Sequence, residues 1–100
     1  MKLRIRVEGE GLGVNETGLE AIEKRIRLAL GTRAVSIEAV DLTLAALDED
    51  QERVRCRLAL RHAGGLQTFV EEDAKDPLTA AQWVVWRMVH FLDRRALREN

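Results

Sequence analysis

The fold is decided by one stretch of strict alternation, Arg53-Val54-Arg55-Cys56-Arg57-Leu58-Ala59-Leu60-Arg61. Successive side chains of a strand point to opposite faces, so the apolar positions from Val54 to Leu60 face a core and the arginines face solvent. The connection His62-Ala63-Gly64-Gly65 follows directly, and a short glycine connection makes the next strand antiparallel. The stretch therefore predicts a strand over about residues 52–61 and an antiparallel partner near 66–72.

Three other segments are predicted to complete the sheet. Residues 2–7 alternate strictly, with Leu3 and Ile5 facing inward, and residues 36–47 alternate in the same way. The strand near 66–72 is less regular, so two phases stay open. In the favoured phase Leu66, Thr68 and Val70 point inward while Phe69 points outward.

Two helices are predicted from spacing and capping residues. The first covers about 16–30, with Asn15 as its cap, or Thr17 in a capping box with Glu20. The second covers about 77–97, because Asp76 can cap it and proline is tolerated at position 77 in the first turn. Its core-facing stripe at helical spacing is Leu78, Ala81, Val85, Met88, Leu92 and Ala96.

These elements give the order β-α-β-β-β-α over a chain of 100 residues, enough for one hydrophobic core. The predicted fold class is α+β. We expect a single domain over 1–100, with one four-stranded sheet and both helices packed on one face.

Several function classes find no support in the sequence. Cys56 falls on the apolar phase of its strand, and neither His62 nor His90 has a second ligand at metal-binding spacing. The glycines Gly9-x-Gly11-x-Gly13 suggest a nucleotide-binding loop of the GxGxxG type, but Glu16 stands three residues after Gly13, where that motif needs glycine. A carboxylate at this position would repel phosphate. We therefore predict no catalytic residues, metal site, cofactor or small-molecule substrate. The longest apolar run is too short to cross a membrane, and a cytoplasmic protein is expected.

Arginine is the first feature that points to a partner. Sixteen basic residues nearly balance seventeen acidic ones, but thirteen of the bases are arginine, which suits bidentate contact with phosphate. The acids Glu38, Asp41 and Glu71 on neighbouring strands provide an alternative, since cross-strand pairs could neutralise the bases. The bases on the solvent-facing phase are Lys2, Arg4, Arg6, Arg53, Arg55, Arg57 and Arg61.

The second feature is the outer side of the C-terminal helix. At 100° per residue, Trp83, Trp86, His90 and Leu97 fall opposite the core stripe, where a surface helix is normally polar. Exposed tryptophans beside arginine are typical of interfaces. These four residues predict a surface for a protein partner or a homodimer.

The order of elements and several short motifs resemble the ribosome hibernation promoting factor and ribosome-associated inhibitor family, over nearly the whole chain. These pieces are the basic strand 2–7, the capped helix start at Val14-Asn15-Glu16-Thr17, the strand pattern Ile37-x-x-Val40-x-Leu42, and Asp76-Pro77-Leu78-Thr79-Ala80-Ala81.

The resemblance implies a small stress-response protein that binds the small ribosomal subunit in its decoding channel and keeps ribosomes inactive. Together with the arginine-rich faces, it implies RNA binding by Arg4, Arg6, Lys24, Arg25, Arg53, Arg55, Arg57, Arg87 and Arg94. The leading hypothesis is therefore a ribosome-binding or structured-RNA-binding translation regulator. The alternative is a protein-interaction module that uses the tryptophan side of the last helix without nucleic acid.

Overall fold

The elements of the computed structural model follow the alternation and the helical periodicity of the sequence. The structure describes residues 1–8, 12–31, 37–47 and 53–99, with side chains placed as far as residue 95. Two predicted features, the loop glycines Gly9 and Gly11 and the acidic turn at 48–51, lie outside these residues. The elements are β1 (Lys2–Glu8), α1 (Glu16–Leu30), β2 (Ile37–Ala46), β3 (Val54–His62), β4 (Gln67–Ala74) and α2 (Pro77–Glu99).

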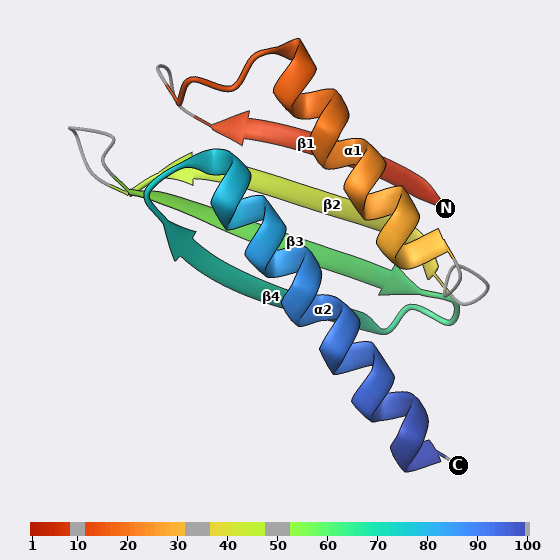
Figure 1. Ribbon diagram of the computed structural model, residues 1–100. Helices are drawn as coiled ribbons and strands as arrows, with labels where there is room; N and C mark the ends of the chain where they lie inside the picture. Colours follow the sequence, from red (N-terminus) through yellow and green to blue (C-terminus); the bar gives the residue numbers. More distant parts are fainter. Residues whose placement is uncertain (9–11, 32–36, 48–52, 100) are drawn as a thin grey trace.

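The four strands form one mixed sheet in the order β1-β2-β3-β4. β1 pairs parallel with β2 through the crossover helix α1, and β3 pairs antiparallel with both β2 and β4. Figure 1 shows both helices on the same face of the sheet, α1 over β1 and β2 and α2 over β3 and β4. The predicted α+β architecture is confirmed, and no other described element covers the opposite face, which we call the open face.

The core lies between the sheet and the two helices. Ile5, Leu42, Leu58 and Val70 stand opposite one another on the four strands and point to the helix side. Leu42 and Leu58 are fully buried, as are Ile26 of α1 and Met88 of α2, while Ile5 and Val70 on the edge strands are partly buried. The burial of apolar side chains from all six elements forms one continuous core.

The hairpin between β3 and β4 uses the predicted glycines. Gly64 and Gly65 both have positive φ, 91° and 93°, a conformation that only glycine adopts without strain. The favoured phase of β4 is confirmed for Phe69, which is exposed, and for Val70. It is wrong for Leu66, which is 51% exposed, because Leu66 precedes β4 and strand alternation does not control it.

The helix starts resolve the alternatives left open above. Asn15, not Thr17, caps α1, since its side chain accepts a hydrogen bond from Gly18 N at 2.9 Å. Asp76 caps α2 by accepting from Thr79 N and Thr79 Oγ1, both at 2.8 Å, and these bonds lower the pKa of its carboxyl.

One position of the predicted core stripe is wrong. Leu78 is 50% exposed. The buried stripe is centred on Ala81, Val84 and Met88. Leu78 lies roughly 90° around the helix from that centre.

Candidate nucleic-acid interface

The open face carries the charged side chains of all four strands in cross-strand rows. Strand register, not local sequence, decides which charges meet, because residues paired in the sheet are far apart in the chain. Each row except the first contains at least one acid beside its bases. The rows are Lys2–Ala39–Arg61–Gln67, Arg4–Asp41–Ala59–Phe69, Arg6–Thr43–Arg57–Glu71 and Glu8–Ala45–Arg55–Asp73.

Three arginines of this face are paired with acids. Arg4 Nε lies 2.9 Å from Asp41 Oδ1, and Arg61 Nε lies 3.5 Å from Glu38 Oε2. Arg55 has two acidic neighbours, Asp73 at 2.9 Å and Glu71 at 3.6 Å. The hydrogen bond from the Arg55 guanidinium holds the pKa of the Asp73 carboxyl below its ordinary value. The predicted alternative, cross-strand neutralisation, therefore applies to these three bases.

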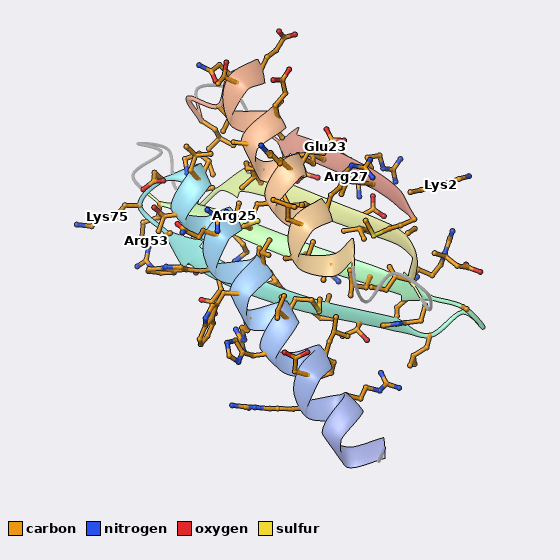
Figure 2. All side chains as sticks on the ribbon, turned by 45° about the vertical axis from the view of Figure 1, so that its right-hand side comes forward. Lys2, Glu23, Arg25, Arg27, Arg53 and Lys75 are labelled. Atoms are coloured by element: carbon orange, nitrogen blue, oxygen red, sulfur yellow. The ribbon has the colours of Figure 1, made fainter. Side chains whose placement is uncertain are left out.

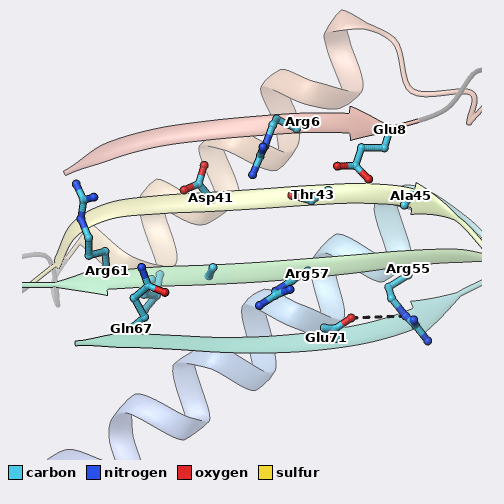
Figure 3. A pocket seen from close by; sticks show the side chains of 12 residues that line it. Arg6, Glu8, Asp41, Thr43, Ala45, Arg55, Arg57, Arg61, Gln67 and Glu71 are labelled. Atoms are coloured by element: carbon cyan, nitrogen blue, oxygen red, sulfur yellow. Dashed lines mark ion pairs between the residues drawn. The ribbon is translucent and has the colours of Figure 1, made fainter. Parts of the chain in front are cut away.

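Arg6 and Arg57 differ from their neighbours. They flank the small Thr43 in one row, and neither has an ion-pair partner among the described residues. The Arg57 guanidinium stacks on the Phe69 ring at 4.1 Å from its centroid, which leaves the edge of the guanidinium free to donate. Figure 3 shows Arg6 and Arg57 on the strands to either side of Thr43, and all three residues line an open depression of about 450 Å³.

Most of the remaining predicted RNA-binding residues lie on the helix side. Lys24 and Arg25 are exposed on α1, and Arg94 is exposed on α2. Arg87 is occupied: its Nη1 donates to Glu72 Oε1 at 2.9 Å and to the Glu71 carbonyl at 3.1 Å, which fastens α2 to β4. The structure thus divides the predicted site between two faces instead of bringing it together.

The predicted interface residues of α2 are exposed where side chains are described. Trp83 is 50% exposed and Trp86 is 65% exposed, and the His90 ring packs on the Trp86 indole at 4.2 Å between centroids. Leu97 belongs to α2, but its side chain lies beyond the described part.

Two adjacent depressions border Trp83. One, of about 520 Å³, is lined by Trp83, Trp86, Gln82 and Glu72. The other, of about 920 Å³, includes Trp83, Arg53, Lys75, Asp73 and Thr79.

Lys75, Thr79 and Gln82 were missed by sequence reasoning. Thr79 stands one turn before Trp83, so its position at i−4 was a usable signal. Lys75 reaches the site through the turn from β4 into α2, which no local spacing reveals. Figure 2 shows Arg53 and Lys75 at the end of the sheet where α2 begins.

Cys56 and His62, which were weighed above as catalytic or metal-binding candidates, both belong to β3. Cys56 is fully buried on β3, and burial raises the pKa of its thiol to about 12. His62 is partly buried and its Nε2 lies 3.1 Å from Thr68 Oγ1. Within the described ranges, no three His, Cys, Asp or Glu residues converge as a metal site would require, and no helix is long and apolar enough to span a bilayer.

The topology and the continuous core define the class of fold: one four-stranded mixed sheet with two helices on one face. Solved structures with the same fold are known. No family model matches the sequence, and no curated protein matches it. One similar structure is the Thermus thermophilus Protein Y N-terminal domain, with a TM-score of 0.71 and 18% identity, covering 94% of this chain and 98% of that one. Another is a ribosomal subunit interface protein from Coxiella burnetii, with a TM-score of 0.79 and 10% identity, covering 97% and 99%. The resemblance read from the sequence is confirmed in the fold.

Proposed function

We propose that this protein binds the small ribosomal subunit in the cytoplasm as a non-enzymatic regulator of translation, in the manner of a hibernation factor. The observation that carries the proposal is the fold it shares, over more than nine tenths of the chain, with the Protein Y N-terminal domain and with a protein described as a ribosomal subunit interface protein. Fold alone does not define function. The surface chemistry provides the second support, because phosphate binding needs cations that are not already neutralised.

The cations that meet this condition lie on both faces. They include Arg6 and Arg57 on the open face and Lys24 and Arg25 on α1, none of which has an ion-pair partner among the described residues. Arginine at such positions can hold phosphate oxygens in a bidentate manner. A protein bound inside a channel lined with RNA is contacted on both of its faces. The presence of these cations on both the open face and α1 is consistent with binding in such a channel.

The other predicted contacts contribute less in this proposal. Arg4, Arg55 and Arg87 already hold carboxylates at 2.9 Å, so each would have to exchange a partner to reach phosphate. A net charge of −1 provides little long-range attraction. Affinity then depends on the few cations without acid partners.

The salt dependence of binding measures the number of phosphate contacts directly. Four phosphate contacts predict that affinity for small subunits falls on the order of 100-fold as salt rises from about 50 to about 200 mM. Replacing Arg6 and Arg57 together by glutamine should reduce that fall to about 10-fold, because two contacts remain. Co-sedimentation with purified small subunits at the two salt concentrations gives both slopes.

The matched control is Arg4→Gln/Arg61→Gln, which removes the same two charges from the same face at residues paired with Asp41 and Glu38. It should bind within about 2-fold of wild type, since a paired arginine adds little to phosphate binding. No co-sedimentation at low salt, or binding that salt does not change, would contradict the proposal.

A second candidate function is supported by the exposure of Trp83 and Trp86. In it the tryptophan side of α2, with His90 and Leu97, binds a protein partner or a second copy of the chain without nucleic acid. An exposed aromatic pair of this kind usually marks an interaction surface.

A further inference from the structure

The two indoles form the floor of a surface that the arginine contacts above do not use. We call Trp83, Trp86, Gln82, Arg53 and Lys75 the tryptophan platform. The core stripe of α2 lies on the opposite side of the helix, so neither the sheet nor α1 can cover the indoles. The packing of His90 on Trp86 restricts the orientation of that indole.

The charges around the platform leave a positive balance. Each nearby acid is occupied: Glu72 by Arg87 and Asp73 by Arg55, each at 2.9 Å. Asp76 accepts two hydrogen bonds from Thr79 as the cap of α2. Arg55 and, more weakly, Arg53 lower the pKa of the Asp73 carboxyl. Neither Arg53 nor Lys75 forms an ion pair in the part of the chain that the structure describes.

The exposed area argues against a second copy as the occupant. A tryptophan offers about 150–250 Å² in all, so two indoles that are 50% and 65% exposed present at most roughly 300 Å². A stable protein interface buries about 800 Å² on each partner. Among the α2 side chains that the structure describes, the other exposed apolar residues are Leu78 and Phe91. Both project about 110° away from the midpoint of the indoles and cannot extend the same flat surface.

The same surface suits a ligand that combines flat aromatic rings with negative charge. Stacking needs only one free face of each indole, and a cation beside it can take the phosphate that links successive bases. We propose that the tryptophan platform stacks unpaired bases of a single-stranded RNA segment, while Arg53 and Lys75 bind the flanking phosphates. The Gln82 amide supplies a donor and an acceptor for a base edge. The inference rests on the proposed function, in which the RNA belongs to the ribosome.

The chain provides its own probe of this surface. It contains two tryptophans and no tyrosine, so its intrinsic fluorescence above 295 nm excitation comes from Trp83 and Trp86 alone. A single-stranded oligouridine or oligoadenosine of about 12 nucleotides should quench this emission on binding, because stacked bases contact the indoles. A duplex of the same length should not, because its bases are already stacked.

Affinity is measured independently by the anisotropy of a labelled single strand. Trp83→Leu and Trp86→Leu should each weaken binding about 10-fold, since each removes a stacking surface from an exposed position. Phe91→Leu is the matched control, an exposed aromatic on the same helix outside the platform, and should leave affinity unchanged. Arg53→Gln and Lys75→Gln should each reduce the salt slope by about 1.

Three results would overturn the inference. The first is tryptophan fluorescence that single strands do not quench. The second is an unchanged affinity for single strands in the Trp83→Leu/Trp86→Leu protein. The third is a wild-type dimer in sedimentation equilibrium that the double substitution converts to a monomer. Small-subunit co-sedimentation separates the two proposals. Retained ribosome binding without single-strand binding removes only the platform, while single-strand binding without ribosome binding removes only the proposed function.

Discussion

Replacing Leu58 by alanine is expected to lower the free energy of unfolding by about 2–5 kcal/mol. Leu58 is fully buried at the centre of β3, with Leu42 and Val70 on either side and the helices above. The substitution removes apolar contacts and leaves a cavity that β3 and its two neighbouring strands cannot easily close. A domain of this size has only about 5–15 kcal/mol of stability, so much of the total depends on this one side chain.

Urea unfolding followed by circular dichroism gives the loss. Phe69→Leu is the matched control, because Phe69 is a large apolar side chain on the next strand that faces solvent on the open face. It should cost less than about 1 kcal/mol. A similar loss for both substitutions would contradict the assignment of the two faces.

The Cys56 thiol is expected to react at least about 1000-fold more slowly in the folded protein than in the unfolded chain. Burial raises its pKa from 9.0 to about 12, so the thiolate fraction near pH 8 falls by about three orders of magnitude, and the reagent cannot reach the sulfur. The rate of alkylation by iodoacetamide in buffer and in about 8 M urea measures the ratio. A Thr43→Cys/Cys56→Ala protein, with its thiol on the open face, should react at the ordinary rate in both.

The same pKa shift has a consequence for stability at high pH. The unfolded thiol ionises near pH 9.0 while the folded thiol keeps its proton until about 12. The unfolded state therefore binds fewer protons in this interval, and the free energy of unfolding falls as pH rises through it. Well below pH 9.0 both states carry the proton, so the thiol contributes no pH dependence there. Wild type but not Cys56→Ala should show this part of the decrease.

Local sequence was sufficient for most of the fold because alternation and helical spacing are local properties. The β3 pattern correctly assigned Val54, Cys56, Leu58 and Leu60 to the core. The errors occur where an element ends: Leu66 belongs to a turn, and Leu78 lies in the first turn of α2 at the margin of the buried stripe. At such positions the neighbouring elements, not the periodicity, decide which side chains are covered.

The candidate site was less predictable, since it depends on pairs that are distant in the chain. Arg4 meets Asp41 across 37 residues and Arg55 meets Asp73 across 18, and strand register alone brings them together. The exposure of Trp83 and Trp86 follows from helical spacing and was correctly predicted. The approach of Arg53 and Lys75 to Trp83 requires the start of β3 and the turn before α2 to meet, which the sequence does not encode locally.

The parallel pairing of β1 has a kinetic consequence. β2, β3 and β4 are consecutive and antiparallel, so short loops close them, whereas β1 reaches β2 only after the whole crossover through α1. Closing a longer loop costs more chain entropy, and contacts between distant residues slow folding. We expect the meander from β2 to β4, with α2 packed on it, to assemble first and β1 to join last. Pulsed hydrogen exchange during refolding would then protect the β1 amides after those of β3, and simultaneous protection would contradict this order.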